Sequence, residues 1–539
     1  MLLAGSTITS FAQAPAEQPT PPDTFVSTHH QLQINGKTLR YTAHAGFLPL
    51  NDNDTGELMA RMFIIAYSVE RSPGQPARPV TFIWNGGPGS NSAQVHLLGY
   101  GPKGFNTPST FPEWNPAAPP AEIVDRPETW LDVSDLVFVD PIGTGYSRAA
   151  SDKYRDILYT THGDGEAVAE MIRLYRARFN VWDAPLFLAG ESYGTTRAME
   201  VAADLERRRT HLAGVMLVSG FYNLGQKIPS ALNTALRVPM FTATAYYHKL
   251  LPPELQSLSR EEAVKRATEW ARSYYAPMIE KRDSLSMEQR LSVLDQLKRY
   301  TGIDPHVVNA RKLSIDSDDY MDYVMADQGF ELGRFDTRMT RSRRSDGTPW
   351  TDMSDASLSP MLDLMEGTSV PLIRYLRETL KYKSDLLYRG PFGEAFHPLP
   401  LRKGNAEFYD DAMSVSWDHG ASERGEAAWE VEQRSDNGAA GGNGSGQLPL
   451  RSAMEANPKL LIFVVQGMYD GILGISCASK EEAVARTDPS LRDRVRTGCY
   501  AGGHMMYTDV GVRSEMKRDF ARFIRDGMAA SQGGEPSSR

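Results

Sequence analysis

Hydrophobic and polar residues alternate along two early segments of the chain. The first covers 30–46 and reads HQLQINGKTLRYTAHAG; the second covers 60–70 and reads ARMFIIAYSVE. A period of two residues is typical of strands that bury one face and expose the other. Both segments are therefore predicted to be antiparallel strands.

The next pattern is a set of short, continuous apolar runs separated by helix-like stretches. Runs of this kind fill parallel sheets, which are buried on both faces. Strands that alternate with helices predict an α/β fold with a mostly parallel central sheet and helices on both faces. The runs are 79–84, 134–140, 185–190, 213–220, 459–467 and 494–500, and the helical stretches include 163–179 and 195–209.

This alternation stops after residue 222 and resumes near 457. The residues between are charged and helix-rich, as in 253–282 and 286–300. Such an insertion predicts a helical cap, 223–456, over the carboxyl edge of the sheet, where open α/β sheets place their sites. The core is then 24–222 and 457–528. The Gly-rich stretch 434–449 is predicted to be a mobile loop, and 529–539 a disordered tail.

Composition narrows the functional classes. The 539 residues carry a net charge of −9 with dispersed Lys and Arg, which argues against a nucleic-acid-binding surface. The longest apolar runs are far shorter than a membrane span. The sequence does not indicate an oligomeric state.

The N-terminus predicts export to the periplasm or the extracellular space. Residues 1–23 form a weakly apolar, then Pro-rich leader in which Ala12-Gln13-Ala14 resembles a signal-peptidase site, although no Lys or Arg precedes the apolar part. A disordered tail on a cytoplasmic protein is the alternative. The two cysteines, Cys477 and Cys499, are 22 positions apart, and export favours a disulfide between them over two free thiols.

A serine between two glycines lies where a strand is followed by a helix. The stretch Gly190-Glu191-Ser192-Tyr193-Gly194 has this form, and only small residues fit the flanks of so tight a turn. The pattern is that of a nucleophile elbow, which projects the Ser192 hydroxyl above the sheet. It predicts the α/β-hydrolase fold and nucleophilic catalysis.

The partners of such a serine follow it in the order acid, then histidine. His504, in YAGGHMMY, is the only histidine after His419 and follows the last predicted strand. Asp470 follows the strand before it, whereas Asp488 and Asp493 lie in helix or turn contexts. Ser192, Asp470 and His504 are therefore the predicted triad.

A glycine-rich loop follows the strand 79–84. It reads Asn85-Gly86-Gly87-Pro88-Gly89, and glycines allow the backbone to approach a ligand and direct N–H groups toward it. An α/β-hydrolase takes one oxyanion donor from such a loop and the other from the residue after the nucleophile, here Tyr193.

Together these motifs resemble the serine carboxypeptidases, the S10 peptidase family, in a divergent, bacterial-type form. The resemblance covers about 75–222 and 457–525, and the stretch 130–147 also carries it. It implies the triad above, an oxyanion hole from Gly87 and Tyr193, and peptide substrates with a free C-terminus. It also implies that Asn85, Gly86 and Glu191 hold the substrate carboxylate and that Met505 lines the leaving-residue pocket. No cofactor or metal is expected.

The chain departs from the family pattern at three positions. Ile83 stands where a tryptophan is usual, Ser90 replaces a cysteine, and Gly99 stands where a second glutamate is usual. Carboxylate recognition and pH optimum are therefore expected to differ from the family's. The alternative function is a serine esterase or acyltransferase on the same machinery. A proline-releasing aminopeptidase is disfavoured by Asn85, and a non-catalytic binding protein by the complete triad.

Overall fold

The structure is a computed structural model of the 539-residue chain. It describes residues 23–72, 74–106, 122–222, 224, 227–309, 311–348, 355–357, 370–389 and 448–532. Residues 1–22 of the predicted leader lie outside the described residues. Residues 434–447 of the predicted mobile loop lie outside them as well. No helix in the described part of the chain is long and apolar enough to cross a membrane.

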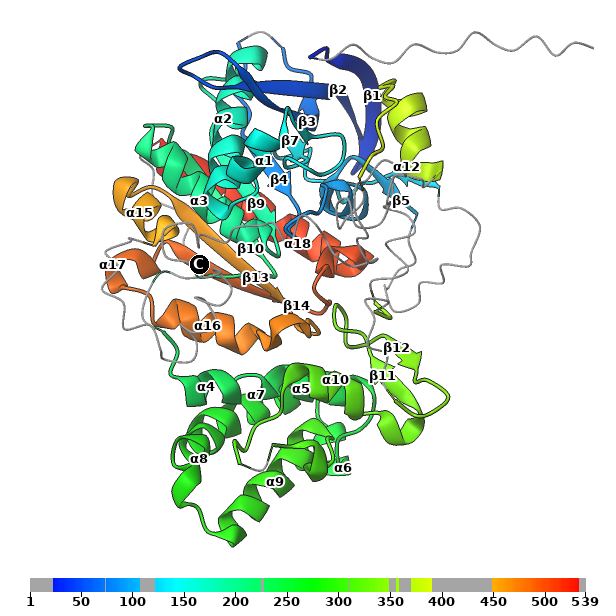
Figure 1. Ribbon diagram of the computed structural model, residues 1–539, viewed down its shortest axis with the longest axis vertical. Helices are drawn as coiled ribbons and strands as arrows, with labels where there is room; N and C mark the ends of the chain where they lie inside the picture. The colour runs from blue at the N-terminus through cyan, green and yellow to red at the C-terminus, as the bar shows by residue number, and fades with distance from the viewer. Residues whose placement is uncertain are drawn as a thin grey trace, which may run out of the picture.

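A ten-stranded mixed sheet runs through the molecule (Figure 1). Six neighbouring strands, which come last in the order below, are mutually parallel, and three antiparallel strands extend the sheet at one edge. The order is β1 (Val26–Ile34), β2 (Lys37–Asn51), β3 (Leu58–Val69), β7 (Asp135–Val139), β4 (Val80–Trp84), β9 (Leu186–Glu191), β10 (Leu212–Val218), β13 (Leu461–Gly467) and β14 (Val495–Tyr500), with β8 (Arg148–Ala149) paired to β3. The predicted buried strands and the α/β-hydrolase fold are confirmed. The segment 30–46 is not one strand, because the chain turns at Asn35 and Gly36, both with positive φ, between β1 and β2.

Helices cover both faces of this sheet. Apolar side chains of α2 (Thr161–Phe179) and α3 (Gly194–Arg207) form one hydrophobic cluster with the sheet. The π-helix η1 (Gln94–Tyr100) and α18 (Val510–Ser531) contribute to the cluster on the other face. The remaining core elements are α1 (Asp152–Leu158), α16 (Cys477–Ala485), α17 (Pro489–Arg492), η10 (Ile472–Gly474), η11 (Met506–Thr508) and the pair β5 (Lys103–Phe105) and β6 (Ile123–Asp125). Because α18 continues to Ser531, the predicted disordered tail does not begin at 529.

The inserted helices form a body with its own hydrophobic core (Figure 1, green). The ends of helix α9 are set by residues close to them in the sequence. Ser286 and Gln289 form a capping box at its start, and Gly302 ends it in the left-handed conformation. The elements are α4 (Ser230–Ala235), α5 (Val238–Tyr247), α6 (Pro253–Gln256), α7 (Arg260–Trp270), η3 (Ala271–Tyr275), α8 (Ala276–Glu280), η4 (Arg282–Ser284), α9 (Met287–Thr301), η5 (Pro305–Val307), α10 (Ser317–Tyr323), η6 (Ala326–Gln328), β11 (Phe330–Leu332) and β12 (Thr340–Ser342).

Not all of the predicted cap, 223–456, lies in this body. Helices α12 (Val370–Arg374) and η7 (Tyr375–Thr379) pack into the cluster that contains α18. Helix α15 (Pro449–Ala456) packs into the cluster that contains α3. The insertion therefore returns to both faces of the sheet before β13 begins, because its apolar side chains there are buried against the sheet.

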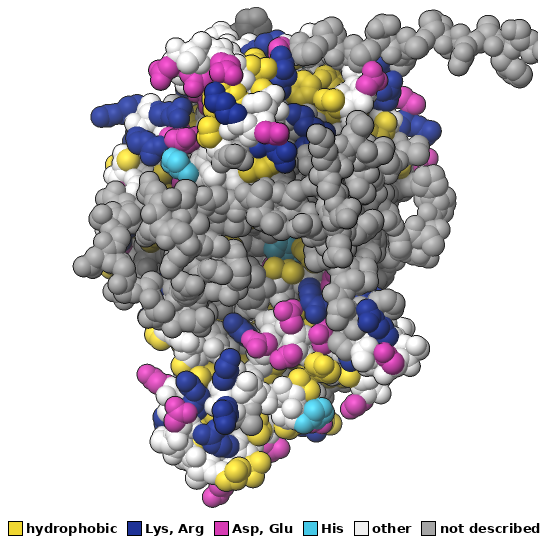
Figure 2. Space-filling model, in the orientation of Figure 1, with side chains coloured by type: hydrophobic (Ala, Val, Ile, Leu, Met, Phe, Trp, Pro, Cys, Tyr) yellow, Lys and Arg dark blue, Asp and Glu magenta, His cyan; other side chains and the backbone are white. Residues whose placement is uncertain are grey.

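Charged side chains of both signs are interspersed over the visible surface of the cap (Figure 2).

Candidate active site

The predicted elbow is a strand–turn–helix unit. Ser192 lies between β9 and α3 with φ of 58°, in the left-handed region that non-glycine residues rarely adopt. A Cβ on Gly190 would lie 2.0 Å from the Gly194 carbonyl oxygen, and one on Gly194 would lie 2.8 Å from the Asn85 oxygen. Both flanking positions therefore require glycine, and the strained turn directs attention to Ser192 as a functional residue.

His504 and Asp470 meet at the carboxyl ends of two adjacent parallel strands, β13 and β14. His504 Nδ1 is 2.9 Å from Asp470 Oδ2, and both side chains are buried. Asp470 is fixed in turn, since it accepts hydrogen bonds from Gln466 Nε2 and from the Ile472 N–H. Burial lowers the pKa of His504, but the charge and hydrogen bond of Asp470, with a contribution from Glu191, outweigh burial and raise that pKa to about 9.

The other imidazole nitrogen of His504 faces Glu191. Nε2 has no hydrogen-bond partner among the described residues and lies 3.4 Å from Glu191 Oε1. Ser192, at the same edge of the sheet, makes no side-chain hydrogen bond to His504 in the described structure. The predicted acid, Asp470, and the predicted base, His504, are thus in direct contact. The predicted nucleophile, Ser192, is the residue next to Glu191, which faces the other side of the imidazole.

The glycine-rich loop lies directly against the elbow. A Cβ on Gly86 would lie 2.5 Å from the Tyr193 nitrogen and 2.8 Å from Ser192 Cβ. Gly87 follows with φ of 103°, which favours glycine. The Trp84 indole N–H donates to the Gly194 carbonyl at 2.9 Å, which ties the loop to the elbow. Gly87 and Tyr193, the predicted oxyanion donors, thus belong to two backbone segments in contact.

Asn85 and Glu191 are hydrogen-bonded to each other beside the predicted nucleophile, Ser192. Asn85 Nδ2 donates to Glu191 Oε2 at 2.8 Å, and both residues are buried. Burial raises the pKa of Glu191, whereas His504, the Asn85 amide and the Gly86 N–H act to lower it. The carboxyl therefore keeps a proton to higher pH than an exposed glutamate.

Two further residues complete this cluster and were not predicted. The Asn85 amide also donates to Gln94 Oε1 at 3.1 Å and to the Tyr507 hydroxyl at 3.4 Å. A Cβ on Gly99 would lie 3.2 Å from the Tyr507 ring, so the ring occupies the space beside that side-chain-free position. The sequence signal was weak: Tyr507 is only three residues after His504, but nothing local directs it toward Asn85.

Met505 lies deeper than predicted for a residue that contacts substrate. Its side chain is 5 % exposed and belongs to the hydrophobic cluster around α18. The leaving-residue pocket remains a prediction.

A described cap segment, 334–339, contacts the histidine loop. The His504 N–H donates to the Phe335 carbonyl at 2.6 Å, and the Phe335 ring packs edge-on against the imidazole. Arg338 bridges Asp336 and Asp509 and donates to the Ala501 carbonyl. Sequence reasoning missed this contact, because a short loop of a cap carries no motif.

The two cysteines are joined by a disulfide near the same loops. Cys477 begins α16, just after the Asp470 turn, and Cys499 lies in β14, before His504, with Cα atoms 5.7 Å apart. The bond links the segments that carry the acid and the histidine.

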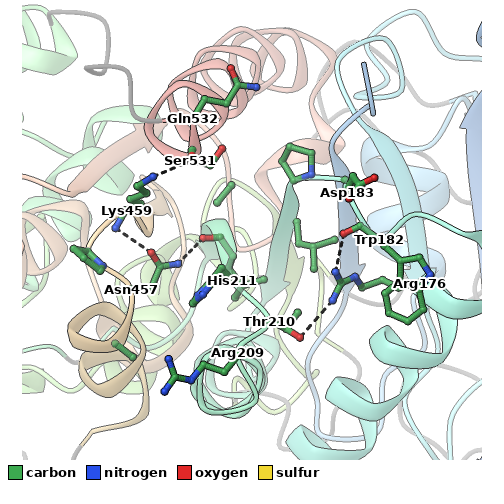
Figure 3. A pocket seen from close by; sticks show the side chains of 17 residues that line it. Arg176, Trp182, Asp183, Arg209, Thr210, His211, Asn457, Lys459, Ser531 and Gln532 are labelled. Carbon is green, nitrogen blue, oxygen red and sulfur yellow. Dashed lines mark hydrogen bonds between the residues drawn. The ribbon is translucent and has the colours of Figure 1, made fainter. Parts of the chain in front are cut away.

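A cavity of about 610 Å³ lies at the opposite edge of the sheet, where β9 and β10 begin (Figure 3). Its polar groups bond to one another: Arg176 donates to the Trp182 carbonyl, and Lys459 to that of Ser531. The predicted triad is at the carboxyl edge and lines no part of this cavity.

Comparison of the sequence with known proteins identifies the serine carboxypeptidase family. A sequence model described as serine carboxypeptidase matches residues 34–342, more than half of the 539 residues. The chain is 28% identical over 191 residues to the pheromone-processing carboxypeptidase kex1 of Schizosaccharomyces pombe, covering 33% of this chain and 32% of that protein. It is 34% identical over 118 residues to KEX1 of Phytophthora infestans, covering 22% and 17%. The aligned part thus spans about a third of the first relative and less of the second.

One plant protein and one solved structure are also similar to the chain. Serine carboxypeptidase-like 44 of Arabidopsis thaliana is 27% identical over 191 residues, covering 32% of this chain and 36% of that protein. The crystal structure of KEX1ΔP, a prohormone-processing carboxypeptidase from Saccharomyces cerevisiae, aligns over 90% of this chain and 91% of that chain, with a TM-score of 0.48 and 14% identity.

Proposed function

Because the chain belongs to the serine carboxypeptidase family, we propose that it releases C-terminal residues from peptides through an acyl-enzyme on Ser192. His504 accepts the proton of the serine hydroxyl as Oγ attacks the scissile carbonyl, and Asp470 holds the imidazole in the required tautomer. The N–H groups of Gly87 and Tyr193 stabilise the oxyanion. His504 then protonates the leaving amine, and water hydrolyses the ester by the same steps in reverse.

The observation that carries the choice of substrate is the hydrogen bond between Asn85 and Glu191. Asn85 precedes the glycine loop and Glu191 precedes the nucleophile, so both side chains are held within one residue of the reacting groups. A protonated Glu191 shares its hydrogen with a substrate carboxylate, and the raised pKa of Glu191 supports that protonated form. A serine esterase has no comparable use for this pair.

Peptides with free and with amidated C-termini test the proposal. Wild-type protein is expected to release residues from the free acids in preference to the amides. Asn85→Ala should lower kcat/KM for free acids by an amount that corresponds to roughly 1–3 kcal/mol of transition-state stabilisation. The reason is that the substrate carboxylate loses the hydrogen-bond donor that Asn85 supplies. It should leave amidated peptides and simple esters nearly unchanged.

A matched control is Asn91→Ala. Asn91 is also buried after β4, but it bonds to the Ala93 N–H and the Arg389 carbonyl and not to Glu191. Equal losses on both substrate classes for Asn85→Ala would mean that no carboxylate is bound here and would favour an esterase or acyltransferase.

Export is part of the proposal, and the disulfide between Cys477 and Cys499 supports it, because such bonds persist in oxidising compartments. Fractionation of cells that express the natural gene tests it. Activity confined to the cytoplasm would contradict it.

A further inference from the structure

The guanidinium of Arg197 is buried beneath the glycine loop. Arg197 lies in the first turns of α3, is 0 % exposed, and donates from Nη1 to the backbone carbonyl of Asn85 at 2.7 Å. Its Nε donates to Asp164 Oδ2 on α2, and that carboxylate is also buried. Burial raises the pKa of Asp164, and the charge and hydrogen bond of Arg197 oppose that rise. Nη2 has no hydrogen-bond partner among the described residues.

The bond from Arg197 fixes the orientation of one peptide plane. In a trans peptide the carbonyl and the following N–H point in opposite directions. Since the Asn85 carbonyl points to Arg197, the Gly86 N–H points the other way, where it donates to the Glu191 carboxyl. Rotation of this plane would withdraw that donor and shift Gly87, the next residue.

Simple stabilisation does not account for a charged pair at this place. A buried ion pair is often no more stabilising than apolar side chains of the same volume. Unlike an apolar side chain, Arg197 donates a directional hydrogen bond to the Asn85 carbonyl, close to Ser192. The contact also joins three elements, α2, α3 and the end of β4, because Asp164 holds the guanidinium from the neighbouring helix.

We propose that Arg197, held by Asp164, is a positioning residue that orients the Asn85–Gly86 peptide for catalysis. In that orientation the Gly86 N–H faces Glu191 and the carboxylate of an incoming peptide, and Gly87 presents its N–H to the oxyanion. The first role rests on the proposed carboxypeptidase function. The second applies to any acyl substrate of Ser192.

The chain offers a matched control at the other end of the same strand. Arg78, just before β4, donates from Nε to Asp135 Oδ1 at 2.7 Å and from Nη2 to the Leu131 carbonyl at 2.6 Å. It thus makes the same two kinds of bond as Arg197, to one carboxylate and one backbone carbonyl. Its location is remote from the elbow, so its loss affects stability without affecting the loop.

The test compares two charge-free double variants, Arg197→Met/Asp164→Leu and Arg78→Met/Asp135→Leu, on an ester without a carboxylate and on a free-acid peptide. Rates are taken per active site titrated with a fluorophosphonate. The Arg197 variant is expected to lose on the order of 10- to 100-fold in kcat on the ester, as for a misplaced oxyanion donor, with a further rise in KM for the free acid. The Arg78 variant should retain both constants.

Wild-type constants per site in the Arg197 variant, or an equal loss in the Arg78 variant, would overturn the proposal. If the Arg197 double variant does not fold, Arg197→Lys serves in its place: a lysine has one nitrogen where Arg197 uses two, so it cannot keep both bonds in their present geometry, and the same reduction in kcat is expected. If wild-type protein shows no preference for free acids, the proposed function fails, while the ester measurement still decides whether Arg197 orients the loop.

Discussion

The Nε2 atom of His504 lies 3.4 Å from Oε1 of Glu191, so the nitrogen that accepts the serine proton in the proposed mechanism faces a carboxylate. The same imidazole holds Asp470 through Nδ1. Two carboxylates around one imidazole favour its protonated form, and together they raise the pKa of His504 to about 9 against the effect of burial. In the proposed mechanism a protonated His504 cannot act as the base, so we expect the protonation state of Glu191 to affect turnover as well as substrate binding.

Glu191→Gln is expected to move the pH profile of ester hydrolysis. Turnover requires neutral His504, which is populated above the pKa of that group. Removing the negative charge of Glu191 lowers this pKa, so the acid limb of kcat/KM should shift by about one pH unit to lower pH. The check is a pH series on an ester without a carboxylate, with Glu170→Gln on α2 as the control. An unmoved acid limb would mean that Glu191 does not act on His504.

Free-acid peptides should show a second pH dependence. Only protonated Glu191 shares a hydrogen with the substrate carboxylate, and burial raises the pKa of Glu191. The KM for free acids should therefore rise as pH increases through that pKa, whereas the KM for amidated peptides should not. Glu191→Gln keeps a donor at every pH and should flatten the dependence. Parallel KM curves for the two peptide classes in wild-type protein would contradict this account.

Ser192→Ala is expected to lower turnover by several orders of magnitude, on the order of 10⁶, with the fold intact. Asp470→Asn should be milder, on the order of 10⁴, because the acid orients the imidazole and does not form the covalent bond. A fluorophosphonate should label Ser192 in wild-type protein, as read by peptide mass spectrometry. Labelling at another residue would refute the assignment of the nucleophile.

Arg338→Lys tests whether the cap segment 334–339 holds the histidine loop in place. Lysine cannot reproduce the bonds of Arg338 to Asp336, Asp509 and the Ala501 carbonyl. A small displacement of His504 should reduce kcat about tenfold per titrated site. Arg266→Lys is the control, since Arg266 bonds to Glu262 within the cap helix α7, outside the segment 334–339. Equal effects of both changes would show a general loosening of the cap.

The disulfide is expected to stabilise the fold. The Cys477–Cys499 bond closes a separation of 22 residues, which corresponds to roughly 3 kcal/mol by the loop-entropy model. Urea unfolding of the Cys477→Ser/Cys499→Ser variant against oxidised wild-type protein measures the difference. Mass spectrometry of unreduced, alkylated protein verifies the bond, and two alkylated thiols would show that it does not form.

The sequence by itself determined the strands and turns that depend only on residues close together in the chain. The apolar runs of β4, β9, β10 and β13 have the length and composition of buried strands, and Gly190 and Gly194 mark the turn that only glycine permits. Chain order alone placed Asp470 and His504 after successive strands. Because adjacent parallel strands end at one edge of a sheet, those two side chains were predictable as neighbours.

The tertiary structure alone decided the contacts between segments that no short pattern relates. The bond of Arg197 to the Asn85 carbonyl spans 112 positions, and the Phe335 carbonyl meets His504 only because the cap folds onto that loop. Helices α12 and α15 pack on the sheet because their apolar faces are buried there. Helical periodicity shows that a helix has an apolar face, but it does not show whether that face packs on the sheet or on the cap. Such contacts depend on how separately coded elements pack, and packing is a property of the assembled chain.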